Sequence, residues 1–204
     1  MNPQGANVLI VDDNPGFRSS LERFLRSVGF SVQAFPTAAD FLEAGSPAAP
    51  ACALVDLRMP GMNGLELQEE LTRRGRTLPL VFLTAFGAVA ASVQAMMRGA
   101  VDFLEKPFEE ERLLDAIDRA LEKDVRAQRQ NSDRQHALER LARITTRERE
   151  VCDCLMAGLL NKQIAAQLGV AESTVKVHRS RMMQKLGVSS LVDLTRLVDR
   201  ARGG

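Results

Sequence analysis

The chain has few of the residues that mark disulfide-bonded proteins. Its 204 residues include only three cysteines, Cys52, Cys152 and Cys154, all among apolar neighbours. An odd count argues against a disulfide framework and for a reducing compartment, and the spacing of the last two is not a usual zinc or redox spacing. We expect all three to be small, buried apolar side chains.

Long apolar stretches and histidines are also scarce. Residues 78–91 form the longest nearly apolar stretch, which is shorter than the ~18–20 residues that a membrane span needs. The N-terminus lacks the basic segment followed by an apolar one that a signal peptide requires. His136 and His178 are the only histidines, and neither has a catalytic partner nearby in the sequence. We therefore expect a cytoplasmic protein that does not use histidine as a catalytic base.

What the chain does have is charge of opposite sign at its two ends. Residues 1–121 hold 11 Lys and Arg against 16 Asp and Glu, whereas residues 144–204 hold 10 against 6. The acidic front and basic back predict two domains with different partners. The expected partner of the basic domain is a polyanion. We place the first domain at 1–121, a linker at 122–143 and the second domain at 144–204.

In the front domain, short apolar runs alternate with segments of helical periodicity. We expect strands at 7–11, 31–35, 51–55, 80–83 and 101–104, and helices between and after them, the last at about 109–123. Asn14 and Pro15 are typical of a helix start, and Gly29 of a helix end. The almost wholly apolar runs predict a five-stranded parallel sheet with helices on both faces, which makes this an α/β domain.

Five polar residues stand at the ends of these runs: Asp12, Asp13, Asp56, Thr84 and Lys106. In parallel sheets the functional crevice lies at the carboxyl ends of the strands. Three converging carboxylates repel one another, and an all-oxygen set suits Mg²⁺. A carboxylate beside such a metal can attack a phosphoryl group, and a lysine and a hydroxyl can then stabilise the added charge.

Each of these residues also has an ordinary interpretation. Asp13 and Thr84 are suitable helix caps, Asp56 can cap the turn before Gly61, and Lys106 can be a solvated loop residue. Each ordinary role alone is at least as probable as a functional one. The placement of all five at strand ends favours a common site.

Residues 7–121 resemble the receiver domain of bacterial two-component response regulators, which has a flavodoxin-like fold. The motifs that carry this resemblance are Asp12-Asp13, Asp56 to Gly64 (DLRMPGMNG), Thr84-Ala85 and Phe103 to Phe108 (FLEKPF). The resemblance implies that Asp56 accepts a phosphoryl group from a sensor histidine kinase. It implies Mg²⁺ bound by Asp13, Asp56 and the backbone carbonyl of Arg58, with Asp12 in support.

The same resemblance implies a switch. Lys106 and the Thr84-Ala85 segment bind phosphoryl oxygens, the Lys106-Pro107 peptide is cis, and Thr84 moves while Phe103 turns inward. Because Phe103 lacks a tyrosine hydroxyl, the switch depends on packing. Arg58 and Phe86 then set the lifetime of the phosphoryl group.

The linker contains no glycine or proline. A helix that continues from the front domain and a solvated, partly frayed linker are both compatible with it. A coiled coil would need three clean heptads, which the segment lacks.

The back domain has the pattern of four short helices. Thr145 to Glu148 has the form of a capping box, and Asn161 is expected to cap a second helix that ends at Gly169. Further helices are expected at about 172–186 and 190–200. Two short helices joined by a tight turn with glycine are typical of a helix-turn-helix.

The helix at 172–186 carries its apolar residues on one face. Lys176, Val177 and Ser180 point the other way, which fits insertion into a DNA major groove. On charge alone an ordinary solvated helix face is the better explanation.

Residues 144–200 resemble the four-helix DNA-binding domain of the LuxR/FixJ/NarL class, and the combination with a receiver is most similar to the FixJ-type subfamily. The motifs are ITTREREV at 144–151, GLLNKQIA at 158–165 and STVKVH at 173–178. The resemblance implies base contacts from Lys176, Val177 and Ser180, and phosphate contacts from Thr174, Arg179 and Lys185. The last helix would pair with its copy in a dimer.

We therefore expect a phosphorylation-activated, DNA-binding transcriptional regulator that is not an enzyme. Its expected partners are a sensor kinase, double-stranded DNA, RNA polymerase and a second copy of the chain, and its cofactor is Mg²⁺. One alternative is a Mg²⁺-dependent phosphatase, against which the lack of a cap domain or substrate pocket argues. Another is a DNA-binding protein whose unphosphorylated receiver serves only for dimerisation, against which the intact set of five residues argues.

Overall fold

The computed structural model describes residues 5–203 except 46, 48–49 and 86–88. The chain divides into two compact units, Met1–Ala127 and Gln128–Gly204, and each is described by itself. Among the described residues, no helix combines the length and apolar character that crossing a membrane requires. The limits of the two domains and of the linker stay predictions.

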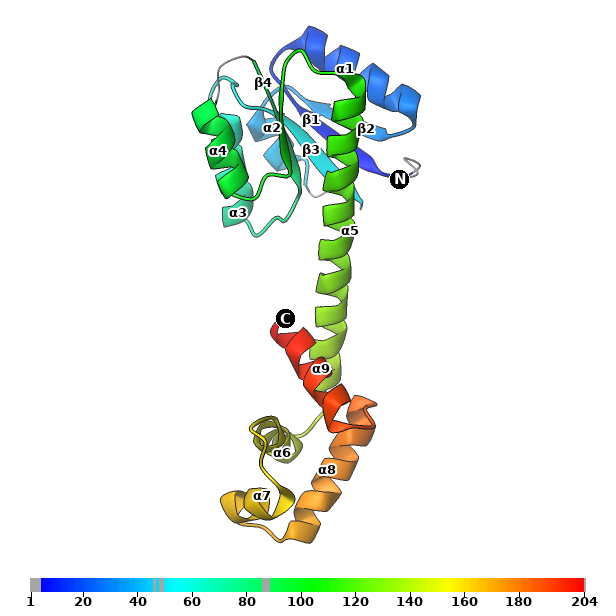
Figure 1. Ribbon diagram of the computed structural model, residues 1–204, viewed down its shortest axis with the longest axis vertical. Helices are drawn as coiled ribbons and strands as arrows, with labels where there is room; N and C mark the ends of the chain where they lie inside the picture. Colours follow the sequence, from blue (N-terminus) through cyan, green and yellow to red (C-terminus); the bar gives the residue numbers. More distant parts are fainter. Residues whose placement is uncertain (1–4, 46, 48–49, 86–88, 204) are drawn as a thin grey trace. The chain divides into compact units, whose positions relative to one another are not determined.

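The first unit is built on a five-stranded parallel sheet, as predicted (Figure 1). Its strands are β1 (Asn7–Val11), β2 (Ser31–Phe35), β3 (Ala51–Asp56), β4 (Leu80–Thr84) and β5 (Asp102–Glu105). Their order across the sheet is β2-β1-β3-β4-β5. Because all strands run in the same direction, their carboxyl ends meet at one edge.

Helices cover both faces of this sheet. They are α1 (Pro15–Val28), α2 (Ala38–Glu43), α3 (Gly64–Arg73), α4 (Val89–Met97) and α5 (Glu110–Leu141). Alternate residues of β1 explain the two layers, since Val8 and Ile10 pack with α1 and α5. Leu9 and Val11 pack with α2, α3 and α4 on the opposite face. Strands buried on both sides are apolar at every position, which is why the runs were recognisable.

Local signals set the limits of α1. The Asn14 side chain accepts hydrogen bonds from the N–H groups of Gly16 and Phe17, and Pro15 follows as the first helical residue. Gly29 ends the helix at a φ of 108°, a left-handed conformation that glycine adopts without strain. Both predicted ends are confirmed.

Helix α5 runs from Glu110 to Leu141 and so includes most of the segment interpreted as a linker. Its first half buries Leu113, Ile117 and Leu121 against the sheet. Near its end, Ala137 belongs to the core of the second unit.

The second unit is all-helical. It contains α6 (Thr146–Met156), α7 (Asn161–Leu168), α8 (Glu172–Leu186) and α9 (Leu191–Arg202). The core includes Ile164, Val175, Met182, Leu186 and Leu194, all fully buried. The turn between α7 and α8 contains Gly169 in a left-handed conformation, the arrangement expected of a helix-turn-helix.

The predicted capping box at the start of α6 is confirmed, but the predicted cap of α7 is wrong. Thr145 and Glu148 bond each other's backbone N–H groups. At α7 the cap position is Leu160, whose N–H donates to the Gln163 side chain. Asn161 is the first residue of the helix, and its side-chain oxygen accepts instead from Arg179. The Asn161 side chain therefore contacts another helix and does not cap its own.

All three cysteines are buried and free, as expected. Burial raises the pKa of the Cys52 thiol far above its ordinary value, and it also raises that of Cys152. Neutral thiols in apolar surroundings are inert packing groups.

Candidate functional site

Three carboxylates meet at the carboxyl edge of the sheet. Asp12 and Asp13 follow β1, and Asp56 ends the neighbouring strand β3. Each offers an oxygen, and these oxygens all lie within 4.8 Å of one another. Asp12 is completely buried, the Asp56 side chain is 13% exposed, and Asp13 is exposed to solvent. Solvent therefore reaches the cluster through Asp13 and, to a smaller extent, Asp56.

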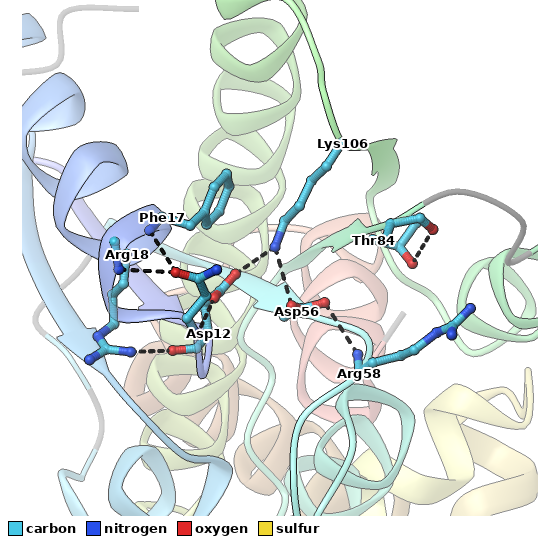
Figure 2. Close-up of polar contacts among 10 residues, drawn as sticks. Asp12, Phe17, Arg18, Asp56, Arg58, Thr84 and Lys106 are labelled. Carbon is cyan, nitrogen blue, oxygen red and sulfur yellow. Dashed lines mark hydrogen bonds and ion pairs between the residues drawn. The ribbon is translucent and has the colours of Figure 1, made fainter.

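Lys106 reaches across this cluster from the end of β5. Its Nζ donates to Asp12 Oδ2 over 2.6 Å and to Asp56 Oδ2 over 3.2 Å (Figure 2). The Lys106 side chain is 20% exposed, so its interpretation as a solvated loop residue is wrong. The Lys106-Pro107 peptide is cis, as expected.

The Asp12 and Asp56 carboxylates are also tied to their own loops. The N–H of Asn14 donates to Asp12 Oδ1 over 2.9 Å, and the N–H of Arg58 donates to Asp56 Oδ1 over 3.2 Å. Arg18 Nη1 donates to the backbone carbonyl of Asp12 over 2.6 Å. These bonds leave Asp12 Oδ2 and Asp56 Oδ2 directed at the lysine.

A glycine permits the close packing behind Asp56. The N–H of Gly64 donates to the carbonyl of Leu57 over 3.1 Å. A Cβ at position 64 would lie 2.6 Å from the Asp56 carbonyl oxygen and 2.9 Å from the Phe82 ring. Glycine is thus needed here for space and not for an unusual φ.

Thr84 lies at the same edge but does not join the acid cluster. Its side chain is 1% exposed, and its hydroxyl donates to the carbonyl of Ala85 over 3.1 Å. Ala85 is exposed and Phe103 is half-buried against the core on the α2–α4 face. Phe86 lies outside the described residues.

The donor set of the acid cluster fits a hard divalent cation. All three side chains supply oxygen, the ligand that Mg²⁺ prefers. Lys106 offsets one of the three formal negative charges, and the two that remain equal the charge of one Mg²⁺. The N–H of Arg58 donates to Asp56, so the residue whose carbonyl the family resemblance implies as a ligand lies next to the acid cluster.

In the second unit, α8 presents the face expected to meet DNA. Lys176, Val177 and Ser180 are exposed, and Val177 is 47% exposed although it is apolar. Lys176 makes a surface ion pair with Glu172, one turn away. Thr174 is half-buried beside them.

Two of the predicted phosphate-contacting residues also make contacts between helices. Arg179 Nη1 donates to Asn161 Oδ1 over 3.3 Å, which joins α8 to the start of α7. Lys185 Nζ donates to Glu148 Oε2 over 2.8 Å, and the Glu148 side chain is 3% exposed. Burial alone would raise the pKa of Glu148, but hydrogen bonds from Lys185 and Thr145 outweigh it and lower that pKa.

Sequence reasoning missed three participants. The centroid of the Phe17 ring lies 3.9 Å from Lys106 Nζ. Arg18 donates a hydrogen bond to the backbone carbonyl of Asp12. Both belong to the helix that follows the acid pair, so their proximity to the site was a usable signal. Glu148 pairs with Lys185, which lies 37 positions away. No local sequence pattern predicts this pair.

Comparisons with known proteins agree with this architecture. Residues 8–118 match the family described as "Response regulator receiver domain", and residues 142–198 match "Bacterial regulatory proteins, luxR family". The chain is 40% identical over 195 residues to the transcriptional regulatory protein FixJ of Azorhizobium caulinodans, covering 96% of this chain and 92% of that one. It is 42% identical over 195 residues to nodulation protein W of Bradyrhizobium diazoefficiens, covering 94% and 85%.

Solved structures give the same result. The response regulator StyR matches with a TM-score of 0.82 and 45% identity, covering 96% of this chain and 98% of that one. Full-length FixJ from B. japonicum matches with a TM-score of 0.60 and 37% identity, covering 98% of both chains. Both matches span receiver and helix-turn-helix together. The chain therefore belongs to the FixJ/NarL family of two-component response regulators, in which a receiver domain precedes a LuxR-type DNA-binding domain and phosphorylation controls transcription.

Proposed function

We propose that Asp56 is the phosphoacceptor of this regulator and that its phosphorylation controls DNA binding by α8. The observation that supports this most strongly is the position of Asp56. Its carboxylate is partly exposed, lies beside two further acids and accepts a hydrogen bond from Lys106. Each of the other two carboxylates is less suited, because Asp12 is completely buried and Asp13 lacks a described contact with Lys106.

The proposed reaction is the transfer of a phosphoryl group from a histidine of a sensor kinase. An oxygen of the Asp56 carboxylate forms a bond to phosphorus while the bond from phosphorus to the histidine nitrogen breaks. The electron pair of the broken bond stays on that nitrogen. Lys106 already contacts Asp56 Oδ2, so its ammonium group stands where negative charge accumulates.

We assign the metal-binding role to Asp12, Asp13, Asp56 and the Arg58 carbonyl. Mg²⁺ would supply positive charge to offset the repulsion between the carboxylates and an approaching phosphoryl group. The chain itself holds Asp12 and Asp56 in place through the N–H groups of Asn14 and Arg58. These bonds orient the carboxylates before any ligand arrives.

The switch that we propose requires Thr84 to change partners. Its hydroxyl is bonded to the Ala85 carbonyl, so binding a phosphoryl oxygen must break that bond and move the segment after β4. Phe103, half-buried next to this strand, would then turn inward. A phosphoryl group gives a hydroxyl side chain about −1.5 to −2 charge at pH 7. On Asp56 the carboxylate charge is consumed in the new bond, so the total charge is similar but the net increment is about −0.5 to −1.

The output is DNA binding as a dimer, which recruits RNA polymerase. Lys176, Val177 and Ser180 would read bases, and Thr174, Arg179 and Lys185 would contact phosphates. Exposed apolar residues support contact with a second copy: Val93, Met96 and Met97 on α4, and Leu191 and Val192 on α9. Apolar side chains on a surface helix of this kind are typical of protein interfaces.

Mass spectrometry tests the phosphoacceptor directly. The full chain is incubated with Mg²⁺ and acetyl phosphate, and the intact mass is measured for the wild type and Asp56→Asn. We expect the wild type to gain one phosphoryl group and the variant to gain none. Equal phosphorylation of both proteins would show that another residue is the acceptor.

A further inference from the structure

The ammonium group of Lys106 is surrounded on three sides. Two of its contacts are the carboxylate oxygens of Asp12 and Asp56, at 2.6 and 3.2 Å. The third is the ring of Phe17, whose centroid lies 3.9 Å from Nζ. Figure 2 shows the Phe17 side chain beside the lysine, on the same side as α1. A cation over an aromatic face is attracted by the negative charge of the ring, and more strongly where water is excluded.

Phe17 is itself held in place. Its backbone N–H donates to the Asn14 cap, and its ring packs against the core on the α1–α5 face. The ring also meets Phe108 edge-on, with 6.2 Å between centroids and 86° between planes. Phe108 follows Lys106-Pro107 directly, so the lysine and its aromatic support are linked through the same loop.

We propose that Phe17 is a positioning residue for the phosphoryl-transfer site. Its ring holds the Lys106 ammonium group between Asp12 and Asp56, where the phosphoryl group arrives. Without the ring, the flexible lysine stem would let the ammonium group turn toward water. This inference rests on the proposed role of Asp56.

The arrangement makes opposite predictions for the metal and for the phosphoryl group. Lys106 helps to bind phosphoryl oxygens, but it competes with a cation for the oxygens of Asp12 and Asp56. Loosening the lysine should therefore weaken the binding of a phosphoryl mimic and leave Mg²⁺ affinity equal or higher. General damage to the site would weaken both.

The test compares Phe17→Leu, Phe17→Tyr and Phe24→Leu in the full chain. Leucine keeps an apolar side chain but removes the aromatic face, and tyrosine restores it. Phe24 lies on the same helix and packs against the same core, so it controls for lost packing. Because the chain contains neither Trp nor Tyr, affinities for Mg²⁺ and for beryllofluoride with Mg²⁺ are measured by calorimetry, and folding by circular dichroism.

We expect Phe17→Leu to weaken beryllofluoride binding about threefold to tenfold, the range that a partly desolvated cation–π contact implies. Mg²⁺ affinity should be unchanged or higher, and Phe17→Tyr and Phe24→Leu should bind beryllofluoride as the wild type does. Unchanged binding by Phe17→Leu, or parallel loss of both ligands, would overturn the inference. Failure of the wild type itself to bind beryllofluoride would instead contradict the proposed role of Asp56.

Discussion

Lys185, near the end of α8, donates a hydrogen bond over 2.8 Å to the buried carboxylate of Glu148 at the start of α6. The same carboxylate accepts from the N–H of Thr145 and completes the capping box. One acid therefore caps one helix and fixes the position of another. The orientation of the helix expected to contact DNA depends on it.

Replacing Glu148 with glutamine should destabilise the second unit. The variant keeps an acceptor for the Thr145 N–H but loses the charged partner of Lys185. Because hydrogen bonds to charged groups are worth more than neutral ones, we expect a loss of about 1–2 kcal/mol in the free energy of unfolding. Urea denaturation measures it. Glu150→Gln, which breaks a surface pair with Arg147, should cost well under about 1 kcal/mol.

The same pair complicates the interpretation of Lys185. An Lys185→Ala variant removes both a candidate phosphate contact and the partner of Glu148. Comparison with Glu148→Gln separates these effects, because that variant keeps the lysine. If both variants lose DNA affinity equally, the contribution of Lys185 is structural.

The lowered pKa of Glu148 predicts how stability changes with pH. In the folded protein Glu148 stays ionised at pH values where the unfolded chain has already bound a proton. Its stabilising effect is complete above the ordinary glutamate pKa of about 4.3 and is lost as the pH falls through the lowered value. The difference in unfolding free energy between wild type and Glu148→Gln should thus be largest at neutral pH.

Below the ordinary pKa of glutamate that difference should shrink. Asp193 also has a pKa lowered by hydrogen bonds, from Ser190 and Ser189. Its contribution to the pH dependence is the same in both proteins and drops out of the difference. Denaturation curves at neutral and acidic pH provide the comparison. A difference that stayed constant down to low pH would contradict the proposed ion pair.

Gly64→Ala should disturb the phosphoacceptor loop. The added methyl group would collide with the Asp56 carbonyl and the Phe82 ring, and we expect a cost of about 1–3 kcal/mol from overpacking. Thermal unfolding measures this, and amide shifts of Asp56 and Leu57 report the displacement. Gly16→Ala is the matched control, since its Cβ meets only Asn14 Oδ1 at 3.4 Å within α1. A neutral Gly64→Ala would disprove the close approach.

Lys176→Ala should weaken DNA binding without affecting stability. Its pair with Glu172 is exposed on both sides, so the fold loses at most about 0.5 kcal/mol. A base contact is worth about 1–3 kcal/mol, which is roughly fivefold to 150-fold in affinity. Fluorescence anisotropy with DNA selected from a random pool, at fixed salt, tests this. Arg147→Ala is the control, since it removes an exposed basic side chain of α6 that forms a surface salt bridge with Glu150. Equal affinity of Lys176→Ala and wild type would refute the assignment of α8.

Most of the fold was predictable because its signals are local. Asn14 and Gly29 mark α1 through hydrogen bonds within a few residues, and doubly buried strands are apolar at each position. The acid cluster was predictable because parallel strands bring their carboxyl ends together. Asn161 was misassigned because Arg179, 18 residues away, engages its side chain. Contacts between residues that are distant in the sequence do not appear in its hydrophobic periodicity.

The contacts around Lys106 show the same limit. Lys106 contacts Asp12, 94 residues away, and Asp56, 50 residues away. Their proximity was predictable because the carboxyl ends of parallel strands share one edge of the sheet. The contact of Phe17 with Lys106 was not predictable in this way, because the sequence indicated only where α1 begins and ends. Phe17 packs against the core and also contacts Lys106 at the site.

The central claim is that phosphorylation of Asp56 increases DNA affinity. The direct measurement is the affinity of the full chain for a selected DNA fragment with Mg²⁺ alone and with Mg²⁺ plus beryllofluoride. Coupling between sites of this kind is typically about fivefold or more. We predict at least that increase for the wild type and none for Asp56→Asn. An unchanged wild-type affinity, or an equal increase in both proteins, would contradict the account.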